Sequence, residues 1–75
     1  MAELPPMKEV FSDMVSKIGY DPGEKILFVQ WANTGRITEY LGVPSDVAMQ
    51  AMNNWSIGEM ISRQIKGVYS FRYYK

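Results

Sequence analysis

The segment from Lys25 to Ala32, KILFVQWA, constrains the fold of this chain most strongly, because it is apolar on both faces. It is rich in β-branched and aromatic residues, which favour a β-strand. Alternate residues of a strand share a face. One face therefore carries Leu27, Val29 and Trp31, and the other carries Ile26, Phe28 and Gln30. Whatever the chain folds into must cover both sides of this strand.

Turn signals on either side of this strand predict an antiparallel meander. Asp21-Pro22-Gly23 precedes it, with Gly23 expected at positive φ, and Asn33-Thr34-Gly35 follows it. The first strand is predicted from about Ser12 to Tyr20. Its apolar Val15 and Ile18 lie three residues apart, which indicates a bulge. The third strand is predicted from Arg36 to Leu41, and Gly42 and Pro44 end it.

The periodicity then changes to that of helices. Apolar residues spaced for one helical face predict a helix from about Ser45 to Asn54, with Ser45 or Asp46 as its N-cap. The sequence Ser56-Ile57-Gly58-Glu59 has the form of a capping box. A second helix is therefore expected from Ile57 to about Lys66, and Gly67 is its expected C-terminal stop.

These elements predict an α+β fold: a three-stranded antiparallel β-meander followed by two short α-helices packed on one face, with an extended C-terminal tail from Val68. We expect residues 1–9 to be a flexible leader and residues 10–75 to form a single domain. Two short helices cover only one face of such a sheet. The other face, with Ile26 and Phe28, must be covered by the tail, by the leader or by another subunit. In the last case these two residues form the interface of a homo-oligomer.

Composition excludes several kinds of chemistry. The 75 residues include no Cys and no His, so disulfides, thiolate nucleophiles, Ser-His-Asp triads and sulfur- or imidazole-based metal sites are excluded. No pairing of Asp, Glu, Lys, Ser or Tyr is specific enough to indicate catalysis. We therefore expect no enzyme activity, no cofactor and no metal. The apolar runs are too short to span a membrane, and the N-terminus has no signal-peptide pattern, so a cytoplasmic protein is expected.

A formal net charge of zero conceals an asymmetry along the chain. Residues 1–59 hold all 8 acidic residues and 4 basic ones, whereas residues 60–75 hold 4 basic residues and no acidic one. This basic end is also rich in aromatic residues. Cations that contact phosphates and rings that stack on bases are typical of single-strand binding surfaces. The candidate nucleic-acid-binding residues are Arg63, Lys66, Tyr69, Arg72 and Tyr73.

The same basic and aromatic residues have a purely structural interpretation. Cations near the end of a helix interact favourably with its dipole, and Glu59 is spaced to pair with Arg63. The rings of the tail would then cover the open face of the sheet. Both interpretations stand at this point.

Hydroxyls and carboxylates gather along the first strand and its turn. They belong to Ser12, Asp13, Ser16, Tyr20 and Asp21. Tyr20 is the candidate for binding a polar ligand here. The competing interpretation is an exposed strand face followed by a turn.

In outline, the chain resembles the KTSC domain family. The resemblance rests on an ordered set of short motifs: Ile18-Gly19-Tyr20-Asp21, a strand ending in Tyr40, Val43-Pro44, Ser56-x-Gly58 and Ile65-Lys66-x-x-Tyr69. The family is named for the C-terminus of some lysyl-tRNA synthetases and also occurs alone in small bacterial and phage proteins. The resemblance implies a small α+β domain of unknown function, for which RNA binding has been suggested by association with the synthetase.

The chain departs from the family pattern at three places. Thr38 stands where the family has the first residue of a Tyr-x-Tyr pair, and only Tyr40 remains as a candidate ligand-binding ring. Ser12-Asp13 replaces a common Ser-Ser pair, and Trp55 replaces a small residue. If the paired tyrosines of the family stack on a base or ligand, one of the two stacking rings is missing in this chain.

Two functions follow as hypotheses. The first is a small non-catalytic module that binds RNA or another nucleic acid through the basic and aromatic end. The alternative is a protein-interaction or homo-oligomerisation module, of the kind phages carry, that uses the second apolar face of the sheet.

Overall fold

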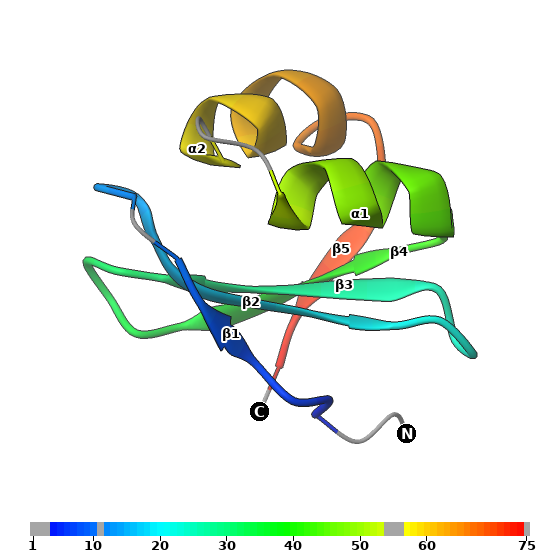
Figure 1. The fold of residues 1–75 in the computed structure, drawn as a ribbon, viewed down its shortest axis with the longest axis horizontal. Coiled ribbons are helices and arrows are strands. Elements are labelled where there is room, and N and C mark those ends of the chain that lie inside the picture. The colour runs from blue at the N-terminus through cyan, green and yellow to red at the C-terminus, as the bar shows by residue number, and fades with distance from the viewer. Residues whose placement is uncertain (1–3, 11, 54–56, 75) are drawn as a thin grey trace.

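The computed structural model describes residues 4–10, 12–53 and 57–74, and the side chains of all of these except Ile57. It contains one antiparallel sheet with the strand order β1-β2-β3-β4-β5 and a layer of helices on one side of it (Figure 1). The strands are β1 (Lys8–Glu9), β2 (Val15–Asp21), β3 (Ile26–Trp31), β4 (Ile37–Leu41) and β5 (Phe71–Tyr73). The helices are α1 (Ser45–Met52), α2 (Ile57–Met60) and the π-helical turn η1 (Ile61–Ile65).

The α+β class, the antiparallel sheet and the two short helical segments are confirmed, but the predicted number of three strands is wrong. Both ends of the chain add a strand to the meander. Lys8–Glu9, within the segment expected to be a leader, pairs with β2 as β1. The extended tail pairs with β4 as β5, with Tyr40 opposite Phe71 and Thr38 opposite Tyr73. Short edge strands of two and three residues carry too little periodicity to be recognised in a sequence.

The first long strand begins three residues later than expected because Ser12 forms a turn. Its hydroxyl oxygen accepts hydrogen bonds from the backbone N–H groups of Met14 (3.2 Å) and Val15 (3.3 Å). The predicted bulge is present, since the pairing of β2 with β3 shifts between Val15 and Lys17. The bulge brings Val15 and Ile18, three residues apart, into the same buried cluster.

The turn before β3 differs in detail from the prediction. The Asp21 carboxylate accepts the backbone N–H groups of Gly23 (3.0 Å) and Glu24 (3.2 Å), as an Asx turn does. The residue with positive φ is Lys25, at 56°, and not Gly23. The turn after β3 is as expected: Gly35 has a φ of 73° and donates its N–H to the Trp31 carbonyl at 2.8 Å.

Helix α1 is capped differently from the prediction. Its N-cap is Pro44, with no capping hydrogen bond from a side chain, so the expected cap by Ser45 or Asp46 is wrong. The fixed φ of proline orients the chain for the helix that follows. The helix ends at Met52, with Asn53 as its C-cap. The Ser56 cap expected for the next helix lies outside the described residues.

The second helical segment ends in a wide turn. Lys66 donates its backbone N–H to the Ile61 carbonyl at 2.7 Å, five residues back, and Gly67 follows with a φ of 84°. Gly58 permits a close approach to the sheet layer, because a Cβ there would lie 3.1 Å from the Met14 sulfur.

The main core lies between the helices and one face of the sheet. Its strand residues include Ile18, Leu27 and Val29, each fully buried. The helices contribute side chains at helical spacing, and these are Ala48, Ala51, Met60, Ile61 and Ile65. The face of β3 with Leu27 and Val29 is thus covered as expected.

The two ends of the chain cover the second face of the sheet. Gly19 lies on this face opposite Phe28, and a Cβ at Gly19 would lie 2.6 Å from the Met7 sulfur and 3.0 Å from the Pro6 carbonyl oxygen. From the other end, the Tyr74 ring meets Phe28 edge-on, with centroids 5.9 Å apart. Both ends of the described part of the chain lie on the side of the sheet away from the helices (Figure 1). The N-terminal segment and the C-terminal tail therefore cover the second face of the sheet together.

Candidate functional site

The two residues predicted as an oligomer interface are buried within the chain itself. Ile26 is 4% exposed and Phe28 is not exposed at all. Neither side chain is available to a second subunit while the leader and tail stay in place. Their burial removes these two residues from any exposed contact surface.

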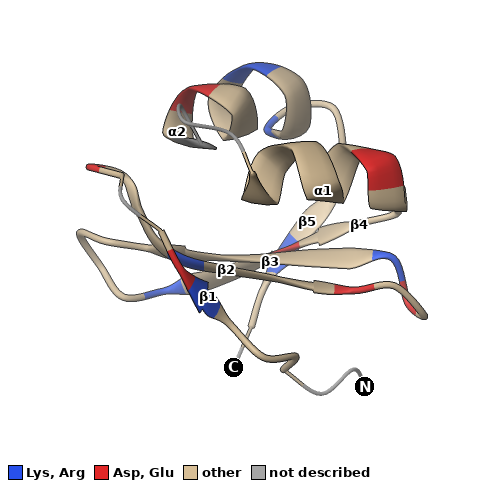
Figure 2. Ribbon diagram, in the orientation of Figure 1, with Lys and Arg blue, Asp and Glu red and all other residues tan. Residues whose placement is uncertain are grey.

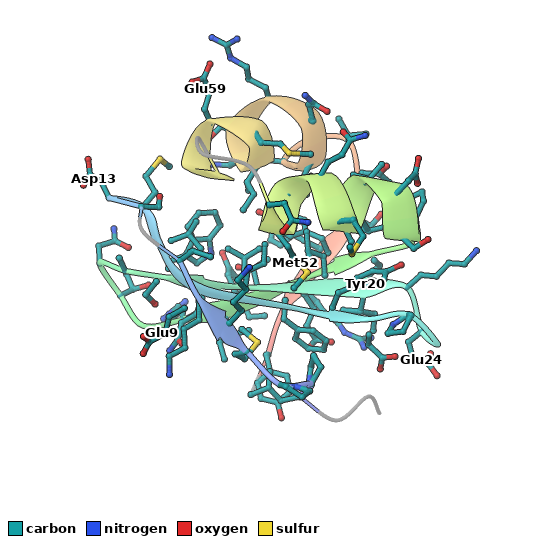
Figure 3. The ribbon with its side chains drawn as sticks, viewed as in Figure 1. Glu9, Asp13, Tyr20, Glu24, Met52 and Glu59 are labelled. Carbon is teal, nitrogen blue, oxygen red and sulfur yellow. The ribbon has the colours of Figure 1, made fainter. Side chains whose placement is uncertain are left out.

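The five residues predicted to bind nucleic acid do not form one surface. Arg63 projects from the helical layer and pairs with Glu59 at 3.0 Å, and Figure 3 shows Glu59 on the outer side of that layer, away from the sheet. Lys66 is exposed just after the helical segment, and Tyr69 packs in part against the main core. Basic positions are spread over both layers, as Figure 2 shows.

Arg72 neutralises a buried acid on the second face of the sheet. The Glu39 side chain is only 7% exposed, and one of its carboxylate oxygens accepts the Arg72 Nε–H at 3.3 Å and an Nη–H at 3.2 Å. The two residues are direct cross-strand neighbours on β4 and β5. A buried carboxylate needs such a partner because it has lost its hydration. Arg72 thus has a structural role that the sequence pattern did not reveal.

Tyr20 and Tyr40, the candidate ligand-binding residues, are both engaged in the fold. The Tyr20 hydroxyl donates to the Val43 carbonyl at 2.6 Å, which ties β2 to the loop before α1 (Figure 3). Burial raises the pKa of Tyr20, and the nearby Asp21 and Asp46 carboxylates raise it further. Tyr40 is 3% exposed, so it presents no ring face to an external base, and burial followed by the nearby Tyr73 raises its pKa.

Thr38 has a specific partner in place of the tyrosine that the family pattern has there. Its hydroxyl oxygen accepts the indole N–H of Trp31 at 2.9 Å. Thr38 is 3% exposed and lies opposite Tyr73 of β5. A half-buried tryptophan usually requires such an acceptor. The threonine therefore suits the tryptophan on the neighbouring strand.

Two exposed aromatic rings and an arginine form a strip of three side chains at the β5 edge of the sheet. Phe71 and Tyr73 are each 56% exposed, although they lie on the same sheet face as the main core. Their rings meet edge-on, with centroids 5.8 Å apart. The Arg36 guanidinium lies 5.5 Å from the centre of the Tyr73 ring. We call Arg36, Phe71 and Tyr73 the aromatic strip.

Of the aromatic strip, sequence reasoning selected only Tyr73 as a site residue. The alternation of Tyr69, Phe71 and Tyr73 was a usable signal, because it places the three rings on one face of an extended tail. Arg36 carried no such signal. It reaches Tyr73 only because β5 pairs with β4, and that pairing joins residues far apart in the sequence.

The comparisons with known proteins agree with this fold. The family model of the KTSC domain matches residues 11–69. The chain belongs to the KTSC domain family. The crystal structure of a KTSC domain protein from Yersinia pestis superposes with a TM-score of 0.87 and 31% sequence identity, over 93% of this chain and 97% of that one. Among curated proteins, none matches the chain.

The described residues of this KTSC domain contain no group of three or more Cys, His, Asp or Glu side chains placed to hold a metal ion. In that same part of the chain, no helix is both long enough and apolar enough to span a membrane.

Proposed function

We propose that this KTSC domain is a non-catalytic module that binds single-stranded nucleic acid, RNA in particular, through the aromatic strip. The observation that carries the proposal is the exposure of Phe71 and Tyr73, side by side on the edge strand of an otherwise well-packed sheet. Large apolar rings left in water cost free energy, and such a patch on a small domain is typical of a contact surface.

The chemistry of the strip suits a nucleic acid strand better than a purely apolar partner. Every base has a flat face that stacks on an aromatic ring, and such contacts contribute about 1–3 kcal/mol per base. Arg36 lies beside the rings and makes no ion pair with any described residue, so its charge is available to a phosphate. Arg63 differs, since it is already paired with Glu59.

Fluorescence anisotropy with a labelled single-stranded oligouridylate tests this proposal. We expect Phe71→Ala and Tyr73→Ala each to weaken binding roughly 5- to 150-fold, the range that follows from the loss of one stacked base. Arg36→Ala should weaken binding and make the logarithmic salt dependence shallower by about 0.7, the value for one phosphate contact on a single strand.

Arg63→Ala is the matched control, because it removes the same side chain from the outer surface of the helical layer. We expect it to change affinity less than about twofold. Absence of binding by the folded wild-type protein, or an equal loss in Arg63→Ala and Arg36→Ala, would contradict the proposal.

A further inference from the structure

The outer edge of β5 is open in the part of the chain that the structure describes. Within the sheet, Leu41 donates its N–H to the Ser70 carbonyl at 2.8 Å, and Tyr74 donates to the Ile37 carbonyl at 2.9 Å. Backbone groups of a strand alternate in direction. Those of Ser70, Arg72 and Tyr74 therefore point toward β4, while the N–H and C=O groups of Phe71 and Tyr73 point outward.

The two edges of the sheet differ in how they are protected. Strand β1 has only Lys8 and Glu9, both charged and exposed, and Pro5 and Pro6 precede it. Charges, prolines and very short strands are common devices against edge-to-edge pairing. Residues 71–73 of β5 contain no proline, and two of the three are exposed aromatics. Of the two sheet edges formed by the described residues, the β5 edge is therefore the one suited to receive another strand.

The edge is also complementary to itself. An antiparallel pairing of two β5 strands with its two-fold axis at Arg72 places Phe71 of each copy opposite Tyr73 of the other. In this register the outward groups of Phe71 and Tyr73 form the hydrogen-bonded pairs. Aromatic cross-strand pairs of this kind are favourable.

Charge also permits this arrangement. The two Arg72 side chains would lie opposite each other on the second face. Like charges in that position repel, but each guanidinium already holds its own Glu39 carboxylate at 3.2 Å, so each pair brings no net charge to the contact. Dissolved salt screens the residual repulsion between the two guanidinium groups.

From these features we infer that a second copy of this chain pairs along β5, in antiparallel register about Arg72, and joins two sheets into one continuous sheet. The pairing lies in the plane of the sheet, so the rings of both copies still project from its face. The dimer would carry two aromatic strips side by side. The contact is short and should be weak, so dimerisation should depend on concentration.

Amide hydrogen exchange of the wild-type protein, measured by NMR at low and high protein concentration, tests the register. We expect the amides of Phe71 and Tyr73 to exchange more slowly at high concentration. The amide of Arg72, bonded within the sheet, should be protected at both. Unchanged exchange at Phe71 and Tyr73 up to the highest attainable concentration would overturn the inference, and so would protection that rises only at β1 or on the helices.

Sedimentation equilibrium of two variants gives an independent test. Tyr73→Pro removes an outward N–H from each copy, a change that an edge strand tolerates, whereas the control Tyr73→Ala removes the ring and keeps that N–H. Loss of two hydrogen bonds per dimer should weaken self-association of Tyr73→Pro roughly tenfold or more relative to Tyr73→Ala. Circular dichroism establishes that both variants are folded. Equal dissociation constants for two folded variants would contradict the inference.

Discussion

Individual polar side chains in this domain mostly serve the fold. Ser12 forms a turn, Thr38 holds the Trp31 indole, and Tyr20 ties β2 to the Val43 carbonyl. Each of these side chains gives a hydrogen-bond partner to a buried or half-buried polar group. Leaving such a group without a partner costs about 1–3 kcal/mol. In a domain of 75 residues such costs are a large part of the total stability. These contacts explain why hydroxyls that suggested a ligand site in the sequence are occupied in the structure.

The raised pKa of Tyr20 predicts how the stability of the fold responds to alkaline pH. Its pKa is raised above the ordinary value of 10.0 by burial and by two carboxylates, and an ionised Tyr20 could not donate to Val43. The folded state thus holds this proton more tightly than the unfolded state. Stability should therefore be unaffected by this group below about pH 10 and should fall as pH rises further. The raised pKa of Tyr40 acts in the same direction.

Urea denaturation at pH values between about 8 and 11 measures this effect. Tyr20→Phe should lower the free energy of unfolding by about 1 kcal/mol at neutral pH, because the hydrogen bond is lost. It should also make the alkaline decline less steep. The control is Tyr69→Phe, whose hydroxyl makes no hydrogen bond to a described residue and which should keep the decline of the wild type. Identical declines in Tyr20→Phe and wild type would rule out this role of Tyr20.

Among the elements, the main strands and helices were predictable because each carries its own periodicity. Strand β3 is recognisable from its β-branched and aromatic residues alone, and the helical spacing of Ala48 and Ala51 reappears as a buried face. The edge strands were not predictable. Lys8–Glu9 and Phe71–Tyr73 are too short to indicate strand pairing by themselves, although alternation marks the tail as extended, and each is a strand because a longer neighbour offers it hydrogen bonds.

Contacts between distant elements limited prediction of the site in the same way. The pairing of Glu39 with Arg72 and the approach of Arg36 to Tyr73 both depend on the register of β5 against β4. The sequence shows a basic and aromatic C-terminus but not which cations are neutralised. Arg63 and Arg72 are paired with acidic residues. The cation beside the rings is Arg36, which comes from residues 1–59, the part of the chain with an excess of acidic residues.

The docking of the N-terminal segment can be tested at Gly19. A Cβ there would lie 3.0 Å from the backbone oxygen of Pro6 and closer still to the Met7 sulfur, so the Met7 side chain must move and the backbone over Gly19 must give way slightly. We expect Gly19→Ala to lower the free energy of unfolding by about 1–3 kcal/mol, as overpacking does. Thermal or urea denaturation measures it.

Gly23→Ala provides the comparison for that change. A Cβ at Gly23 would make only an ordinary contact with the Asp21 carboxylate at 3.4 Å, and Gly23 does not have positive φ. This variant should leave stability within about 0.5 kcal/mol of the wild type, or raise it slightly. Equal losses in the two variants would show that packing of the N-terminal segment against Gly19 does not matter.

On the scale of the whole molecule, a single sheet is covered on one side by helices and on the other by the two ends of the chain. The second apolar face is thereby used within the chain, and Phe28 is fully buried. The β5 edge with the aromatic strip remains exposed. The proposed binding surface and the proposed self-association thus have the same origin: β5 completes the sheet but leaves its own rings and outer backbone groups uncovered.

The most direct test of this account is a ¹⁵N NMR titration of the wild-type protein with a single-stranded oligoribonucleotide. The account predicts that the largest chemical-shift changes occur at Arg36, Phe71 and Tyr73, with little change on the outer side of the helical layer around Arg63. Changes centred on Arg63 and Lys66, or no changes in a folded protein with excess oligonucleotide, would contradict it.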